Sequence, residues 1–317
     1  MLNNYRLRFL LLLLMLATFL AASCGRDATH SETGTAPGGG TSSATSSSPA
    51  RRIISLSPST TEVLYGVGAF ERVVAVSDYD KFPPGVERLP KIGGWSNTNL
   101  EQVTSLKPDL IVMAGAQAPF VKDKLDDLKI QTLIVPDRSI EDALASIELI
   151  GRAVGKEAEA QALLAKTRAK LEDVRARTRD VPRIRVLCVV DRVPGTLRGL
   201  YTATGGSFLA QLIEVAGGES IAPPTASGFG QISKEAVVSL NPDVIIDMVQ
   251  SLESSRLAED PKAVWQELGE VKAVREGRVY PLRETSVLHP SQFVGDTARR
   301  FAELLHPEVF QQGGTNN

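Results

Sequence analysis

Short apolar runs alternate with helix-like stretches along the chain from residue 51 onward. The apolar runs predict buried strands at 52–56, 73–76, 109–113 and 132–135. Between them, residues 57–67, 100–106 and 121–128 carry the cap residues and apolar spacing of helices. Short apolar strands that alternate with helices are typical of a parallel α/β sheet.

The second half of the chain repeats part of the first. Residues 106–112 (LKPDLIV) match residues 240–246 (LNPDVII) at an offset of 134 positions, and the same offset relates Glu101 to Glu235. The repeat predicts two lobes of similar fold, each with a helix, a Pro-Asp turn and a buried strand.

The segment between the two halves predicts one long helix. Residues 157–179 are rich in the good helix formers Ala, Leu, Glu, Lys and Arg. Apolar or small residues recur there at spacings of three and four and define one narrow face: Ala160, Leu164, Thr167, Leu171 and Val174. A helix of about 23 residues is about 35 Å long, which is enough to join two lobes as a stiff strut.

These patterns give an α/β fold of two parallel-sheet lobes joined by a single long helix, with a ligand cleft between the lobes. We expect an N-terminal lobe at 51–155, the connecting helix at 156–181, a C-terminal lobe at 182–310 and a tail at 311–317. The cleft would be formed by loops at the carboxyl ends of the strands.

The first 24 residues predict an export signal. Arg6 and Arg8 precede an apolar run at 9–22, which is too short to span a bilayer comfortably. The run ends in Leu-Ala-Ala-Ser-Cys at 20–24, which resembles a bacterial lipobox and implies acylation of Cys24. Ordinary secretion with cleavage near Ala22 is the alternative. Residues 25–50 are rich in Gly, Ser, Thr and Ala, and we expect a disordered tether there.

Composition and motifs narrow the function. The net charge is −2, which argues against a general nucleic-acid binder. Only 2 Cys and 3 His are present, so a disulfide scaffold is excluded, a Cys/His zinc site is disfavoured, and Cys188 in its apolar run is expected to be a buried thiol. The sequence has no Gly-x-Ser-x-Gly, Walker A or His-Glu-x-x-His motif, so we expect a binding protein with no catalytic residue, metal or cofactor.

Aromatic residues are the candidate ligand contacts, because they make up only 5% of the chain. Four of them lie in loops flanked by glycine or proline, two in each half: Tyr79, Trp95, Tyr201 and Phe229. Such rings suit a large flat ligand of mixed polarity, although each ring would also serve to pin its loop to the core. Trp265, by contrast, lies in an amphipathic stretch and is expected in the core.

The chain resembles the substrate-binding lipoproteins of ABC importers, in the class whose two α/β lobes are joined by one rigid helix. The resemblance covers residues 51–310 and is most specific at 52–62 (RIISLSPSTTE), 76–79 with the prolines at 83–84, 93–101 (GGWSNTNLE) and 106–109 (LKPD). That class serves cobalamin, ferric siderophores and haem, and this sequence is most similar to its cobalamin-binding branch.

The resemblance implies several roles. Aromatic residues matching Tyr79, Trp95, Tyr201 and Phe229 contact the corrinoid in that branch. Glutamates matching Glu101 and Glu235 pair with arginines of the permease. The sequence departs from the branch at Ala114, where the relative has Trp, and at 287–289, where the relative is more polar; His289 there is expected to be structural or to contact the ligand.

The interpretation is therefore an extracytoplasmic, lipid-anchored monomer that captures a corrinoid and delivers it to a permease with its ATPase. A ferric siderophore or haem carrier of the same class is the alternative, with Arg192, Arg198 and Arg283 as candidate anion clamps. A surface-anchored sensor or adhesion module without transport is the alternative from another class.

Overall fold

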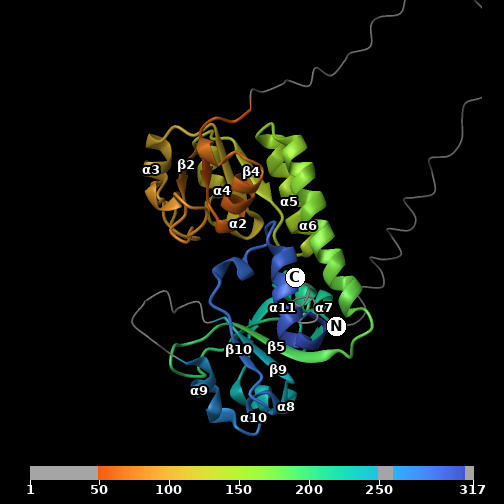
Figure 1. Ribbon diagram of the computed structural model, residues 1–317. Helices are drawn as coiled ribbons and strands as arrows, with labels where there is room; N and C mark the ends of the chain where they lie inside the picture. Colours follow the sequence, from red (N-terminus) through yellow and green to blue (C-terminus); the bar gives the residue numbers. More distant parts are fainter. Residues whose placement is uncertain (1–48, 249–259, 311–317) are drawn as a thin grey trace, which may run out of the picture. The chain divides into compact units, whose positions relative to one another are not determined.

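Two β-sheets, one in each half of the chain, organise the fold (Figure 1). The computed structural model describes residues 49–248 and 260–310. The signal segment, Cys24 and most of the expected tether therefore lie outside the described residues, as does the tail at 311–317.

The first sheet has four parallel strands in the order β2-β1-β3-β4. They are β1 (Ile53–Ser55), β2 (Val73–Val76), β3 (Leu110–Ala114) and β4 (Thr132–Val135), so all four predicted strands are confirmed. The helices of this lobe are α2 (Pro58–Gly66), α3 (Leu100–Ser105), α4 (Ala118–Asp127) and α5 (Ile140–Ala153), with 3-10 turns η1 (Phe70–Arg72), η2 (Val86–Arg88) and η3 (Gly115–Gln117).

The second sheet is mixed, which the sequence did not predict. Its strands are β5 (Ile184–Asp191), β6 (Tyr201–Ala203), β7 (Gly218–Ser220), β8 (Phe229–Gln231), β9 (Val244–Asp247) and β10 (Val279–Pro281). Their order is β10-β9-β5-β6-β8, with β7 also paired to β5. β6 runs antiparallel to β5 and β8, because the connection at 192–200 is too short for the crossover that a parallel neighbour needs.

The helices of the second lobe complete the described chain. They are α7 (Phe208–Val215), α8 (Lys234–Leu240), α9 (Pro261–Trp265), α10 (Lys272–Arg275), α11 (Val294–Leu305) and α12 (Pro307–Phe310), with 3-10 turns η5 (Gln266–Leu268) and η6 (Thr285–Leu288).

The central strands β1, β3, β5 and β9 are buried over most of their length, which explains their nearly continuous apolar sequences. In β5, Val186 and Cys188 belong to one core cluster while Leu187 and Val189 belong to another on the opposite face. Cys188 is fully buried, as predicted, and burial raises the pKa of its thiol far above the usual range.

The long helix α6 (Glu157–Thr178) occupies the predicted place between the lobes (Figure 1). All five residues of the predicted narrow face are buried, and its apolar members belong to one core cluster that includes residues from both sheets. A Cβ on Gly151 of α5 would lie 2.2 Å from Cβ of Ala160, so glycine is required where α5 crosses α6.

The internal repeat extends to its hydrogen bonds. In the first lobe, the carboxylate of Asp109 accepts the backbone N–H groups of Arg51 (2.8 Å) and Arg52 (2.9 Å). The guanidinium of Arg52 donates to the carbonyls of Leu106 (2.6 Å) and Lys107 (3.2 Å), where Lys107 has a left-handed φ of 48°.

The second lobe repeats this arrangement. Asp243 accepts the backbone N–H of Arg185 (3.0 Å), whose guanidinium donates to the carbonyls of Leu240 (2.7 Å) and Asn241 (3.1 Å). Asn241 has a φ of 43°, like its counterpart in the first lobe. Each lobe thus ties the turn before its central strand to the neighbouring strand in the same way.

Candidate functional site

Tyr79 and Trp95 come together at the carboxyl edge of the first sheet. Their loops are joined because Asp78 donates its N–H to the carbonyl of Gly93 (3.0 Å) and accepts the N–H of Gly93 on its carboxylate (3.2 Å). The hydroxyl of Tyr79 lies so close to Gly94 that a Cβ there would meet it at 2.8 Å. Tyr79 is 49% exposed and Trp95 is 39% exposed, so both rings are available to a ligand.

Tyr201 and Phe229 form a matching pair in the second lobe. Tyr201 begins β6 and Phe229 begins β8, where Phe229 is the register partner of Ala203. Because side chains alternate along a strand, Tyr201 and Phe229 lie on the same face. Their ring centroids are 6.3 Å apart and their planes differ by 15°, so the rings are stacked.

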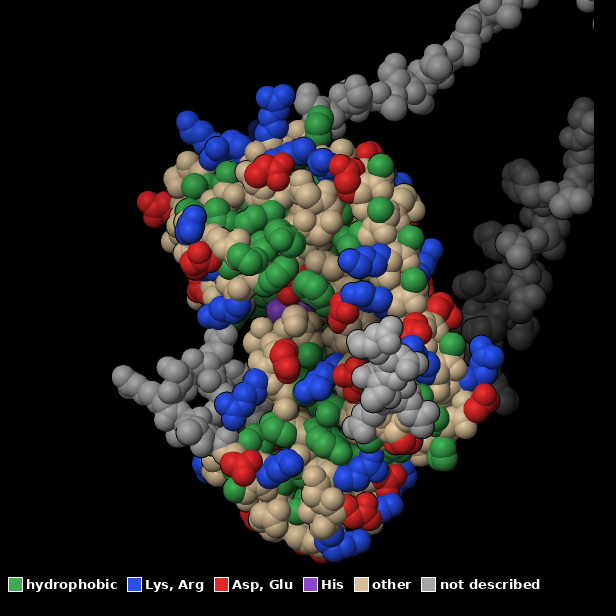
Figure 2. All heavy atoms as spheres, in the orientation of Figure 1, with side chains coloured by type: hydrophobic (Ala, Val, Ile, Leu, Met, Phe, Trp, Pro, Cys, Tyr) green, Lys and Arg blue, Asp and Glu red, His purple; other side chains and the backbone are tan. Residues whose placement is uncertain are grey.

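A further aromatic cluster is centred on Tyr65 and Phe82 of the first lobe. Tyr65 packs edge-on against Phe82 (5.1 Å between centroids) and Phe70 (6.0 Å), and Phe82 packs against Phe293 from the other half of the chain (5.4 Å). Tyr65 is 46% exposed. Hydrophobic side chains gather on the face of the N-terminal lobe in Figure 2.

His289 has a protein partner. Its Nδ1 lies 2.7 Å from Oε1 of Glu62 in α2, and the imidazole is 19% exposed while Glu62 is buried. Ser291 donates its hydroxyl to the other oxygen of Glu62 at 2.5 Å. This structural role was one of the two expected for His289, and its contact with a ligand stays a prediction.

Asp137 is a polar residue at the sheet edge that the sequence analysis missed. It follows β4, and its carboxylate accepts the N–H of Ala116 after β3 (3.1 Å). Burial raises the pKa of Asp137 above its ordinary value, while the bond from Ala116 opposes that shift. The only signal in the sequence was an acid placed directly after a predicted strand.

Arg192 does not serve as the free anion clamp considered above. Its Nε lies 3.0 Å from Oδ2 of Asp247, and both side chains are fully buried. The indole N–H of Trp265 donates to the same oxygen at 2.7 Å, and Trp265 is fully buried, as predicted. The guanidinium is thus committed to a buried network, because an unpaired charge there would be costly.

Glu101 and Glu235 occupy equivalent places in the two lobes. Each is the second residue of its helix, α3 or α8, and each is exposed. Asn99 and Ser233 cap these helices by accepting a backbone N–H three residues on. The backbone N–H at Glu235 and the Ser233 hydroxyl lower the pKa of the Glu235 carboxyl.

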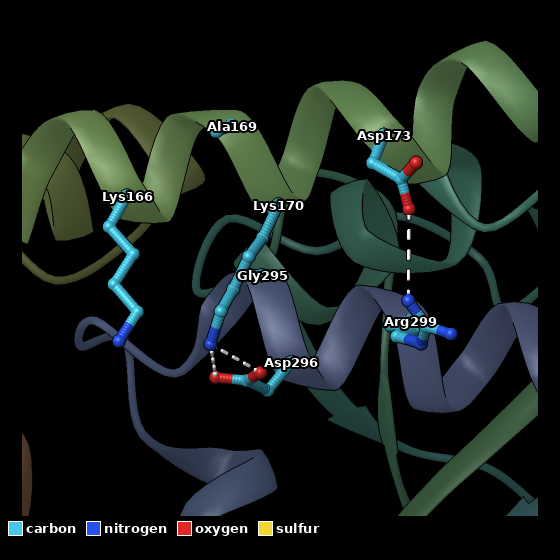
Figure 3. A pocket seen from close by; sticks show the side chains of 7 residues that line it. All are labelled: Lys166, Ala169, Lys170, Asp173, Gly295, Asp296 and Arg299. Carbon is cyan, nitrogen blue, oxygen red and sulfur yellow. Dashed lines mark hydrogen bonds and ion pairs between the residues drawn. The ribbon is translucent and has the colours of Figure 1, made fainter.

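Two surface hollows lie away from the four rings. One, of about 410 Å³, lies between α3 and α4 and is lined by Leu100, Glu101, Thr104, Lys124, Asp127 and Leu128. The other, also of about 410 Å³, lies between α6 and α11, where Lys170 pairs with Asp296 and Asp173 with Arg299 (Figure 3).

The described residues contain no group of three His, Cys, Asp or Glu side chains placed to hold a metal ion. Within the same ranges, no helix has the length and apolar character needed to cross a membrane.

Comparison with known proteins gives a consistent picture. The family described as periplasmic binding protein matches residues 53–285. The chain is 30% identical over 269 residues to the uncharacterized ABC transporter substrate-binding lipoprotein YvrC of Bacillus subtilis, covering 83% of this chain and 82% of that protein. It is 24% identical over 245 residues to the vitamin B12-binding protein of Vibrio parahaemolyticus, covering 77% and 85%.

Solved structures share the fold. The vitamin B12-binding protein BtuF of Vibrio cholerae superposes with a TM-score of 0.70 at 24% identity, over 83% of this chain and 99% of that chain. The heme-binding protein RhuT of Roseiflexus superposes with a TM-score of 0.72 at 23% identity, over 82% and 99%. At these identities the likeness establishes the two-lobed fold and leaves the ligand open.

Proposed function

Because the chain belongs to the periplasmic binding protein family, we propose that this ABC-importer-type binding protein captures cobalamin or a related corrinoid and delivers it to a permease. Members of the family bind solutes for transporters and are not enzymes, in agreement with the missing catalytic motifs. The similar proteins include ones named for vitamin B12 and ones named for heme, so family membership does not identify the ligand. The choice of a corrinoid depends on the residues of this chain.

The observation that carries the proposal is the arrangement of the four rings. Each lobe presents one pair, and both pairs sit at strand ends with at least one ring more than one-third exposed. Rings bury a large apolar area at little cost in rotamer entropy and suit a wide flat ligand. A corrin ring is such a ligand, with an apolar body and amide groups at its edge.

Two polar residues favour amides over carboxylates as ligand groups. Asp137 offers a hydrogen-bond acceptor at the edge of the first sheet, and an amide N–H can donate to it. Arg192, which would have paired with a ligand carboxylate, is held by Asp247 inside the second lobe. A carboxylate-bearing haem or siderophore would depend on the exposed Arg198 and Arg283 instead.

A ligand panel tests the proposal. Purified protein is titrated with cobalamin, cobinamide, haem and a ferric siderophore. We expect saturable binding of cobalamin or cobinamide and weakening of that binding in Asp137→Ala. Tight binding of haem or the ferric chelate with no corrinoid binding would establish the alternative ligand and reject the corrinoid.

Delivery is the second part of the proposal. Glu101 and Glu235 lie at equivalent places of two similar lobes and are exposed, which suits one contact per lobe with a two-fold permease. Charge pairing of this kind steers association and fixes register more than it adds affinity. We propose that Cys24 is the acylated anchor, which keeps the protein at the membrane that holds the permease.

A further inference from the structure

One segment of the C-terminal half leaves its own lobe and packs on the other. Residues 289–296, here called the clasp, lie between the 3-10 turn η6 and the body of α11. They follow β10 of the second sheet, yet they contact α2 of the first lobe and the connecting helix α6.

The contact with α2 is a buried polar junction. Both carboxylate oxygens of Glu62 are engaged, Oε1 by His289 (2.7 Å) and Oε2 by Ser291 (2.5 Å). The side-chain amide of Gln292 donates to the backbone carbonyl of Glu62 at 2.8 Å. Glu62 is 1% exposed and Ser291 is fully buried, so separating them would leave a carboxylate without partners in a site shielded from water.

The contact with α6 is a close helix crossing. A Cβ on Gly295 would meet Cβ of Lys170 at 2.7 Å and the carbonyl of Thr167 at 3.2 Å, so only glycine allows this approach. The hydroxyl of Thr167 is 3.4 Å from the carbonyl of Gln292. Figure 3 shows Gly295 facing Lys170, whose amine pairs with Asp296 at 2.6 Å.

The three elements meet at one point. A Cβ on Gly66 of α2 would lie 2.7 Å from Leu163 of α6 and 3.2 Å from the amide of Gln292. Phe293 then packs edge-on against Phe82 of the first lobe. The clasp therefore contacts the first lobe, the connecting helix and, through β10 and α11, the second lobe.

We propose that the clasp is a second, non-covalent connection between the lobes and that it fixes their relative orientation together with α6. A single helix leaves the lobes free to bend and rotate about its ends, whereas two separate connections remove most of that freedom. The proposal does not depend on which ligand the protein binds. Its key positioning residues are Glu62 and His289.

The test measures the distance between the lobes without a ligand. Lys124 of α4 and Glu276 after α10, both exposed, are replaced by p-acetylphenylalanine and spin-labelled in the full chain, and pulsed electron resonance gives their distance distribution. The spin label reacts with the ketone of p-acetylphenylalanine and does not modify the thiols of Cys24 and Cys188. The distribution is compared for the parent chain, His289→Ala, Glu62→Ala and two control variants.

The controls separate the junction from general loss of packing. His289→Asn keeps an N–H donor close to the position of Nδ1 and should restore the parent distribution. Arg152→Ala removes an exposed ion pair with Glu148 inside α5, outside the clasp, and it should leave the distribution narrow. We expect His289→Ala and Glu62→Ala to broaden the distribution and to add a population at other distances.

Two results would overturn the proposal. If His289→Ala and Glu62→Ala keep the narrow distribution of the parent, the clasp does not fix the orientation of the lobes. If His289→Asn or Arg152→Ala broadens the distribution as much as His289→Ala does, the Glu62–His289 junction has no special role. Should an alanine variant fail to fold, Ser291→Ala, which removes the hydroxyl donor to Glu62, replaces it in the same comparison with the same expected broadening.

Discussion

At the residue scale, the proposed ligand site depends on a few exposed rings. Trp95 lies on a loop that the Asp78–Gly93 hydrogen bonds hold against Tyr79. If its indole contacts the ligand, the fixed loop lowers the entropy cost of binding. Phe120 of α4 is a useful comparison, since it is also exposed, at 50% against 39% for Trp95, but lies outside both ring pairs.

Replacing Trp95 by Ala should weaken corrinoid binding by about 1–3 kcal/mol, the usual scale for a buried aromatic anchor. Phe120→Ala should leave the affinity within about 0.5 kcal/mol, because surface changes away from a site have small effects. Isothermal titration of both variants measures the difference. Equal affinities in the parent and Trp95→Ala would show that the ring does not contact the ligand.

The burial of Asp80 leads to a second testable prediction at the residue scale. It is 2% exposed, its Oδ2 accepts the hydroxyl of Ser77 at 2.5 Å, and its Oδ1 has no protein partner. Burial raises the pKa of Asp80 above the ordinary 3.8, and the bonds from Ser77 and Thr61 and the charge of Lys91 only partly oppose this.

A raised pKa in the folded state means that the folded protein holds this proton more tightly than the unfolded chain. The resulting stability is present below the unfolded pKa and is lost as the pH rises through the folded one. The parent should therefore lose stability relative to Asp80→Asn as the pH rises above the ordinary carboxyl pKa of 3.8. Urea unfolding at a series of pH values measures the free energy of unfolding of both proteins. If the difference between the two free energies does not change with pH, the pKa of Asp80 is not raised in the folded protein.

At the scale of elements, the repeated helix-turn-strand unit places one acid on each lobe. The two units share the Arg-to-turn and Asp-to-strand hydrogen bonds described above, so α3 and α8 begin at equivalent points of the two sheets. A carboxylate in the first turn is favoured by the helix N-terminus, by about 0.3–1 kcal/mol. That contribution is small, so removing the two carboxylates should cost little stability.

The double variant Glu101→Ala with Glu235→Ala should keep nearly the same ligand affinity, because the two acids lie on helices α3 and α8 and not on the segments that carry the four rings. Binding to the permease and transport should fall sharply, and the loss should be larger at low salt, where charge pairing is less screened. Vesicles that contain the permease and its ATPase give both measurements. Normal transport by the double variant would reject a docking role for Glu101 and Glu235 and leave only their interaction with the helix N-termini.

At the scale of the whole molecule, the lobes share a core through α6 and meet again at the clasp. Further contacts join the halves on another side, where Arg138 donates to the carbonyl of Ala226 and Ile140 donates its N–H to Gln211 at 2.9 Å. Ala226 lies three residues before Phe229, so this contact ties the loop that precedes β8 to the first lobe.

The anchor is also a property of the whole molecule. If Cys24 is acylated, the protein should partition into the detergent phase, and Cys24→Ala should release it or leave it unprocessed. Radiolabelled fatty acid and phase partition measure the two outcomes. Equal membrane association of parent and variant, without label in either, would favour ordinary secretion.

The sequence by itself determined the strands of the first sheet, the long helix with its buried face, the repeat and the loop positions of Tyr79 and Trp95. Tyr201 and Phe229 were also expected in loops, but they begin the short strands β6 and β8, because these strands form only by pairing with distant parts of the chain. The correct predictions follow from local patterns: apolar spacing, cap residues and glycine-flanked loops are readable without knowledge of distant neighbours. The core positions of Trp265 and Cys188 were predictable for the same reason.

Only the tertiary structure decided which distant residues meet. Glu62 and His289 are 227 positions apart, Arg192 and Asp247 are 55 apart, and no pattern in the chain pairs them. The antiparallel direction of β6 likewise depends on tertiary structure, because β6 pairs with the edge of β5 that β9 leaves free. Buried polar groups take whatever partner the packing brings, because being left without one costs more than any local preference.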